Sequence, residues 1–368
     1  MNHDNLTAVL ALASALAVFV LAAVQLIKTT FPVHGRLLPL RFTDVDVRNS
    51  VTGRAAGNGF LIGTSDGGNH FQEIYSGQWT FRQIEFPDNV HGWALAAVGD
   101  EAPVYLIRTS DGGAHWQRLG NKSVPYERID FLDAKRGFAY ARAFTYYTDD
   151  GGDSWTRVPT PPNTRGAVFT SRSQGWASVV DPAGKAYRIM KTADGGSTWS
   201  LSLKVPYDAP AYSELYAGGS QVWAVLYGGS GMTQTSYSLY ASSNGGTSWK
   251  RVIAQETAGG GPAPGTGGIP LKQGPAKGKP GGMTLLGSGT AFLTAYSPSG
   301  ERVAVGRSSD GGSTWINEAG VGGYEGVSDF ADADHGWLAV QGTDGKAILY
   351  VTSDGGETWQ PKLSFPPE

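Results

Sequence analysis

Cysteine is absent from this chain of 368 residues, and charged residues make up only 17% of it. Without cysteine there can be no disulfide, thiolate metal site, cysteine nucleophile or lipid anchor on a cysteine. The formal net charge is −3, so no excess of basic residues points to nucleic acid. The six histidines are scattered and lack the spacing of metal ligands. We therefore expect no metal, no other cofactor and no nucleic-acid partner.

Glycine, by contrast, is abundant, and many of the 53 glycines belong to a repeat of the form Ser/Thr-x-Asp-Gly-Gly-x-x-aromatic. Successive copies lie 45, 39, 44, 50, 66 and 44 residues apart. A recurrence of about 40 to 50 residues fits one four-stranded propeller blade. The central acid, or its amide in the fifth copy, stands at seven positions: Asp66, Asp111, Asp150, Asp194, Asn244, Asp310 and Asp354.

Each copy of the repeat predicts a hairpin turn. The acid can accept hydrogen bonds from backbone N–H groups of its own turn, and the preceding hydroxyl adds another. The two glycines supply positive φ, and the closing aromatic, such as Trp359, begins the next strand. Asn244 keeps the acceptor oxygen and loses only the charge. We therefore expect the seven residues to be structural, because a carboxylate used by its own turn is poorly placed to transfer protons.

A second motif precedes most copies, for example Ile84-Glu85-Phe86 followed by His91-Gly92-Trp93. It predicts an inner strand, a short polar turn and a second strand, after which a third strand leads into the repeat. The predicted fold over 40–368 is all-β: a seven-bladed β-propeller of four-stranded antiparallel blades. Residues 257–282 contain ten Gly and five Pro and predict a flexible insert.

The amino-terminal region contains a long apolar run. Residues 6–27 carry no charge and would reach about 33 Å as a helix, enough to span a bilayer core. We predict a hydrophobic helix within 1–30 that anchors the chain in a membrane, with a cleaved signal peptide as the alternative, and a linker over 31–39. Lys28, Arg36 and Arg41 follow the run and favour a cytoplasmic propeller. The Gly- and Trp-rich repeats favour export, and we expect an extracytoplasmic domain at the cell surface.

The repeats and the Gly-Trp-Ala strands together resemble a known family. The repeat is similar to the Asp-box of bacterial neuraminidases, and its combination with the upstream strand resembles the photosystem II assembly and stability factors, over about residues 40–365. The resemblance implies a seven-bladed propeller that binds and chaperones membrane-protein partners and is not an enzyme. Sialidases, sortilin-type receptors and xyloglucan hydrolases share the repeat, so a glycan-binding or glycoside-hydrolysing propeller is the alternative.

Residues at the start of the inner strands should line the mouth of the central channel, opposite the repeat turns. Arg82, Arg128 and Arg165 hold nearly equivalent places in three consecutive blades. Arginine can clamp a carboxylate through two hydrogen bonds, and arginine and aromatic residues are enriched at recognition surfaces. We predict a docking site for an acidic or carboxy-terminal group of a partner protein; solvated rim residues are the alternative. The predicted site comprises Arg82, Arg128, Arg165, Tyr126, Tyr212, Tyr324 and Glu325.

No residue is predicted to be catalytic. The Arg-Ile-Pro signature of sialidases is absent. A glycosidase also needs two carboxylates roughly 5 to 9.5 Å apart, and the sequence alone brings no such pair together.

Overall fold

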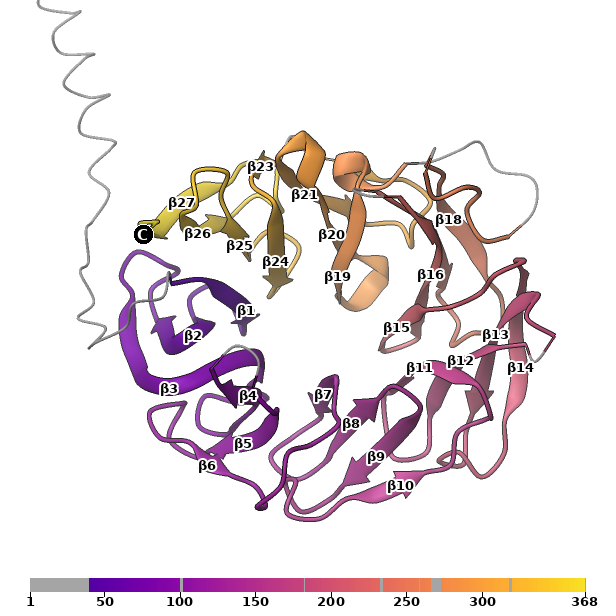
Figure 1. Ribbon diagram of the computed structural model, residues 1–368, viewed down its shortest axis with the longest axis horizontal. Coiled ribbons are helices and arrows are strands. Elements are labelled where there is room, and N and C mark those ends of the chain that lie inside the picture. Colours follow the sequence, from indigo (N-terminus) through magenta and orange to yellow (C-terminus); the bar gives the residue numbers. More distant parts are fainter. Residues whose placement is uncertain are drawn as a thin grey trace, which may run out of the picture.

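The computed structural model describes residues 40–99, 102–181, 183–231, 234–257, 259–265, 273–317 and 320–367. These residues form strands joined by short turns, with three single-turn 3-10 segments and no α-helix among them. The strands build six antiparallel sheets around a central opening (Figure 1), as expected for an all-β propeller.

The first three sheets contain the strands of the amino-terminal half. The first sheet holds β1 (Phe42–Val47), β2 (Gly53–Thr64), β3 (Gln72–Glu85), β4 (Gly92–Val98), β5 (Tyr105–Thr109) and β6 (Gln117–Arg118). The second holds β7 (Arg128–Phe131), β8 (Gly137–Ala141), β9 (Phe144–Thr148) and β10 (Thr156–Val158). The third holds β11 (Thr164–Phe169), β12 (Gly175–Val180), β13 (Ala186–Thr192) and β14 (Ser200–Pro206).

The remaining three sheets complete the ring. The fourth holds β15 (Ser213–Gly218), β16 (Gln221–Ser230), β17 (Thr235–Ser242) and β18 (Lys250–Gln255). The fifth holds β19 (Lys279–Leu285), β20 (Ala291–Ser297), β21 (Arg302–Ser308), β22 (Ile316–Asn317) and β23 (Val321–Gly322). The sixth holds β24 (Glu325–Phe330), β25 (Gly336–Gln341), β26 (Ala347–Thr352) and β27 (Gln360–Phe365).

The prediction of seven blades is wrong, because the described strands form six blades. The cause lies in β3, a strand of 14 residues. Its first half pairs with β2, with Gln72 opposite Gly63, and its second half pairs with β4, with Glu85 opposite Trp93. One continuous strand thereby joins the elements expected for two blades into a six-stranded sheet that carries two copies of the repeat.

The predicted amino-terminal helix (1–30) and linker (31–39) lie outside the described residues. Among the residues from 40 onward that the structure describes, no helix has the length and hydrophobicity needed to cross a membrane.

Neighbouring sheets pack through aromatic rings from the second sequence motif. Trp93 on β4 stacks on Phe131 of the second sheet at 3.9 Å between ring centroids, and Phe292 stacks on Phe330 at 3.6 Å. The glycine of this motif is needed for space: a Cβ on Gly92 would lie 2.3 Å from the ring of Phe86. Burial of these rings accounts for much of the driving force that holds adjacent sheets together.

The ring closes by side-chain packing between the first and sixth sheets. β1 pairs with β2 and β27 pairs with β26, so none of the described strands is exchanged between the two sheets. Phe60 and Phe365 meet edge to face at 5.1 Å, within an apolar cluster that spans both sheets. Asp329 on β24 adds a polar tie, because its Oδ2 accepts a hydrogen bond of 2.7 Å from the N–H of Val47.

Part of the Gly/Pro-rich range 257–282 is described. Ser238 donates to the carbonyl of Pro264 at 2.6 Å, and the N–H of Gly274 donates to Gln255 at 3.1 Å, so these parts lie against the fourth sheet. Strand β19 begins at Lys279 and supplies the innermost strand of the fifth sheet.

Candidate binding channel

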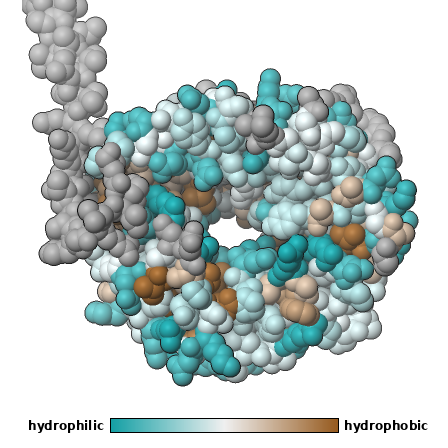
Figure 2. All heavy atoms as spheres, in the orientation of Figure 1, coloured by the Kyte–Doolittle hydropathy of each residue, from teal (hydrophilic) through white to brown (hydrophobic). Residues whose placement is uncertain are grey.

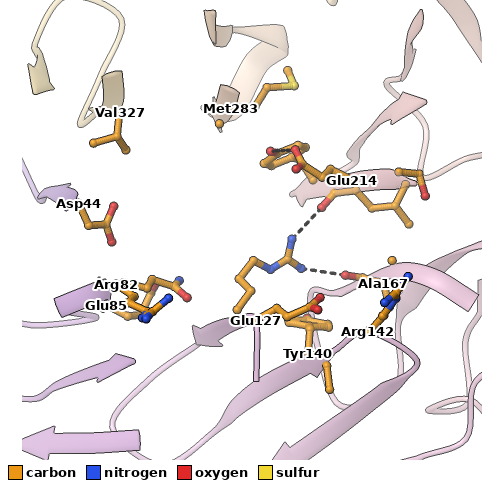
Figure 3. A pocket seen from close by; sticks show the side chains of 18 of the residues that line it. Asp44, Arg82, Glu85, Glu127, Tyr140, Arg142, Ala167, Glu214, Met283 and Val327 are labelled. Atoms are coloured by element: carbon orange, nitrogen blue, oxygen red, sulfur yellow. Dashed lines mark hydrogen bonds between the residues drawn. The ribbon is translucent and has the colours of Figure 1, made fainter. Parts of the chain in front are cut away.

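A cavity of about 610 Å³ occupies the central channel, and all six sheets contribute to its wall. Figure 2 shows the channel as an opening through the middle of the molecule, with hydrophilic side chains on part of its rim. The inner strands β1, β7, β11, β15, β19 and β24 and the second half of β3 line it. In Figure 3, Asp44 and Glu85 lie across the channel from Glu214.

Four arginines line this cavity: Arg82, Arg128, Arg142 and Arg165. Three of them were predicted from their equivalent places in consecutive repeats, and the structure brings these three together. Arg142 was missed because it lies in the hairpin between β8 and β9 rather than at the start of an inner strand. Its position could have been predicted from the antiparallel order of the strands, which places the β8–β9 hairpin at the same end of the sheet as the start of β7.

Arg128 is half-buried and serves as a tie between sheets. Its guanidinium donates to the carbonyl of Ala167 at 2.8 Å and to the carbonyl of Leu215 at 3.3 Å. It also lies 4.2 Å from the centre of the Tyr140 ring. Because these contacts reach the third and fourth sheets, removal of Arg128 would disturb the wall of the channel as well as its charge.

The other predicted residues are divided between several places. Tyr212 lines the channel, but Tyr126 packs on Tyr146 and Trp155 with both centroid distances at 5.5 Å. Burial raises the pKa of Tyr126 to about 12. Tyr324 donates to Glu301 at 3.4 Å, away from the residues that line the channel. Glu325 lines an adjoining cavity of about 890 Å³ between the first and sixth sheets, which also contacts Arg82.

A cluster of two tyrosines and one glutamate, on β15 and directly before it, forms another part of the wall. Glu214 accepts hydrogen bonds from the hydroxyls of Tyr212 at 3.1 Å and Tyr216 at 2.7 Å. Burial and the neighbouring carboxylate hold the pKa of both phenols well above the usual value. Both phenols are therefore protonated donors at neutral pH, which opposes the use of either as a phenolate nucleophile.

The carboxylates on β1 and β24 are engaged by backbone N–H groups of neighbouring strands. Asp44 accepts from Ile84 at 2.8 Å, Asp46 from Phe86 at 2.9 Å, and Asp329 from Val47 at 2.7 Å. Burial raises the pKa of Asp44 to about 8 and that of Asp46 to about 7. Asp329 thus ties the sixth sheet to the first, whereas Asp44 and Asp46 tie β1 to the end of β3 within the first sheet. Asp44 and Asp46 carry part of their protons near neutral pH, which reduces the negative charge of the channel.

The described residues contain no group of three or more histidine or acidic side chains placed to hold a metal ion. The carboxylates named above are instead occupied by hydrogen bonds to backbone N–H groups and to tyrosine hydroxyls.

The repeat turns lie outside the channel and use their acids internally. In the last copy, Asp354 Oδ1 accepts from the Thr352 hydroxyl at 2.7 Å and from the N–H of Thr358 at 2.9 Å. Asn244 Oδ1 makes the same two bonds, at 2.9 Å each, with Ser242 and Ser248. Where the central residue is Asp, the hydrogen bonds of the turn lower its pKa. At Asp150 the hydroxyl and the N–H of Ser154, together with the Thr148 hydroxyl, lower the pKa to about 2. An amide oxygen can therefore replace the carboxylate oxygen in this turn, as it does at Asn244.

Comparison with known proteins supports the repeat and the fold. Residues 350–361 match the BNR/Asp-box repeat family, which confirms the identity of the repeat. None of the curated proteins matches the chain. The structure resembles YCF48 bound to a D1 peptide, with 18% identity, a TM-score of 0.47, and coverage of 90% of this chain and 93% of that one.

Two further solved structures share the architecture. A GH74 xyloglucanase from Xanthomonas campestris has 12% identity and a TM-score of 0.58, with coverage of 89% of this chain and 54% of the xyloglucanase. An oligogalacturonate lyase in complex with manganese has 10% identity and a TM-score of 0.50, with coverage of 89% and 85%. At these identities the likeness shows a propeller fold and assigns no activity.

Proposed function

We propose that this propeller is a non-catalytic binding module that receives an acidic segment or free carboxy terminus of a partner protein in its central channel. The observation that carries the proposal is the convergence of Arg82, Arg142 and Arg165 on one cavity from three consecutive sheets. Arginine side chains pair with carboxylates in a planar, bidentate geometry, and the channel restricts the directions from which a peptide can approach.

Binding fits the channel better than catalysis. The carboxylates of Asp44, Asp46 and Asp329 each accept a hydrogen bond from the backbone of a neighbouring strand, which leaves them poorly placed as acids or bases. The phenols beside Glu214 remain protonated. A wall of arginine, tyrosine and hydrogen-bonded acids has the chemistry of a recognition site.

The test measures binding of a fluorescein-labelled acidic peptide with a free carboxy terminus by fluorescence polarisation. Charge-assisted hydrogen bonds contribute roughly 1.5 to 3 kcal/mol each, so Arg82→Ala combined with Arg165→Ala should weaken binding at least about tenfold. Arg128 is left intact because it ties sheets together. Lys122→Ala is the matched control: it removes an exposed cation that does not line the channel. Unchanged affinity of the double variant would refute the channel site.

The partner itself can be sought by photocrosslinking. A photoreactive amino acid at Tyr212, which is 48% exposed at the channel, should capture the partner in a membrane extract. The double arginine variant that carries the same crosslinker should capture less of the same band.

A glycan is the second candidate ligand, on the basis of two exposed rings at the channel. Phe144 and Tyr212 both line the cavity and are 41% and 48% exposed, and exposed rings can pack on sugar faces. A glycan array separates the two ligands: saturable binding that is lost in Tyr212→Ala but retained in the double arginine variant would favour the glycan.

We further propose that residues 6–27 anchor the propeller to a membrane with the domain on the extracytoplasmic side, since the run is uncharged and long enough to span a bilayer. Protease added to intact cells should then digest the propeller, and carbonate extraction should leave the chain in the membrane fraction. Protection from the protease would reverse the proposed sidedness.

A further inference from the structure

In every sheet, the strand that carries the motif aromatic pairs with the strand that leads into a repeat turn, and one residue of that next strand lies directly opposite the aromatic. The register pairs Trp93 with Arg108, Phe138 with Tyr147, Trp176 with Lys191, Trp223 with Ala241, Phe292 with Arg307 and Trp337 with Val351. Cross-strand partners project from the same face of a sheet, so these six side chains occupy equivalent places. Ala241 is the smallest of the six.

The long basic side chains at this position reach the repeat turn of the next sheet. Arg108 donates to the carbonyl of Gly151 at 3.3 Å and pairs with Asp153 at 3.2 Å. Arg307 lies beside Gly355 and pairs with Glu357 at 3.7 Å. At both turns, an arginine from one sheet lies against the first glycine of the repeat turn in the next sheet.

Basic side chains also lie beside the first glycine of three further repeat turns. Arg54 donates to the carbonyl of Gly112 at 3.2 Å while its guanidinium lies 4.0 Å from the centre of the Phe86 ring. Five of the seven turns have a basic side chain within 4 Å of the Cβ position of their first glycine, supplied by Arg54, Arg108, Arg172, Lys191 and Arg307.

The turn at Gly311 differs from these five. A Cβ on Gly311 would meet no atom of the described residues within 4 Å, and a cavity of about 510 Å³ lies between the fourth and fifth sheets at this point. Ala241 and Trp223 line the cavity together with Asp310 and Gly311. The methyl group of Ala241 is too short to cross this space, whereas a side chain of the length of Arg108 would extend into it.

The hydrogen bonds of the tryptophan also differ. Trp93 Nε1 donates to the carbonyl of Gly151 at 2.8 Å, whereas Trp223 Nε1 donates to Gln221 at 3.2 Å. The carbonyl of Gly151 accepts hydrogen bonds from a tryptophan indole and an arginine guanidinium. The carbonyl of Gly311 receives neither from the equivalent residues, because the Trp223 indole donates to Gln221 and Ala241 has no side-chain donor.

We propose that this cavity, lined by Ala241, Trp223 and Gly311, is a socket for an arginine side chain of a partner protein. The guanidinium donates to the carbonyl of Gly311, as Arg108 does to Gly151 within the chain, and lies against the indole of Trp223. Asp310 adds a negative charge at the cavity wall. The socket lies among the repeat turns, so it gives the propeller a second contact that is independent of the central channel.

The Lys250 side chain also lines this cavity and carries a positive charge. Lys250 lies opposite Ala241 across the β17–β18 pair and is exposed. Its ammonium would repel a guanidinium and would attract an anion, so its removal separates the two ligand types. Loss of Lys250 should strengthen arginine binding and weaken anion binding.

The experiment follows the Gly311 amide and the Trp223 indole N–H by NMR during titration of the propeller with acetyl-Gly-Arg-Gly-amide. The same peptide with neutral citrulline in place of arginine is the matched control. We expect saturable shifts at both groups, with at least tenfold weaker binding of the citrulline peptide. Lys250→Ala should strengthen binding of the arginine peptide. Equal binding of the two peptides, or loss of binding in Lys250→Ala, would overturn the proposal.

Filling the socket from within provides an independent test. Ala241→Arg should raise the melting temperature, because it restores the contacts that Arg108 makes at Gly151, and it should abolish the peptide-induced shifts. Ala241→Met fills the same space without charge and should also block the peptide if Ala241→Arg folds poorly. Persistent binding in both variants would show that the peptide binds elsewhere.

Discussion

Closure of the ring depends on packing between the first and last sheets, and Phe365 provides the sharpest test. Phe365 is 6% exposed and contacts Phe60 and Phe42 at centroid distances of 5.1 and 5.3 Å. Replacement of a buried phenylalanine by alanine costs about 3 to 5 kcal/mol through lost burial and the remaining cavity. Because β27 lies at the edge of its sheet and pairs with β26 alone among the described strands, its backbone can relax, and we expect Phe365→Ala to cost about 3 kcal/mol.

Urea unfolding followed by tryptophan fluorescence measures this loss. Phe365→Leu, which keeps most of the volume, should cost less than half as much, and Leu201→Ala is the control because Leu201 is 56% exposed. Hydrogen exchange should accelerate first in β1, β2 and β27, since none of these strands pairs with a strand across the seam. A loss below about 1 kcal/mol for Phe365→Ala, or faster exchange spread evenly over all six sheets, would refute closure by packing.

Three further predictions concern the carboxylates and Arg128. Asp354→Ala should lower the free energy of thermal unfolding by about 1 to 2 kcal/mol. Asp354→Asn should lower it by less than half as much, because Asn244 makes the same two turn hydrogen bonds. Equal losses in the two variants would mean that the charge matters. Asp44 has a pKa of about 8 in the folded state and about 3.9 in the unfolded state. Between these values the folded state binds one more proton than the unfolded state, so the free energy of unfolding should fall as pH rises from about 4 to 8. Urea unfolding across this range should show a weaker dependence of this free energy on pH for Asp44→Asn than for the native chain. Arg128→Ala should cost about 2 to 3 kcal/mol because it leaves the carbonyls of Ala167 and Leu215 without this donor, while Arg165→Ala should leave the melting temperature within about 1 °C of the native value.

The local parts of this protein could be predicted from the sequence. The repeat turn depends on residues within eight positions of one another, so its hydrogen bonds and positive-φ glycines were readable without any distant contact. The same locality explains the correct prediction of antiparallel strands between the turns. The placement of Arg82, Arg128 and Arg165 on one channel also followed, because equivalent positions in a repeat occupy equivalent places around the ring.

Only the tertiary structure decided how the strands divide into sheets. All seven predicted repeat turns are present. A turn does not determine, however, whether the strand after it ends or continues, and β3 continues until it pairs with β4. The role of Arg128 as a tie was equally hidden, since its acceptors are 39 and 87 residues away. Such contacts depend on how far the inner strands approach one another.

The same limit applies to the cavity at Gly311. The sequence determined that Ala241 is small, but a small residue between two strands is unremarkable by itself. The cross-strand register placed Ala241 opposite Trp223, and the packing of the fourth sheet against the fifth left the space unfilled. Local turn chemistry is therefore set by neighbouring residues in the chain, whereas the sheets, the channel and the socket arise from contacts between residues that are distant in sequence and become neighbours only when the ring closes.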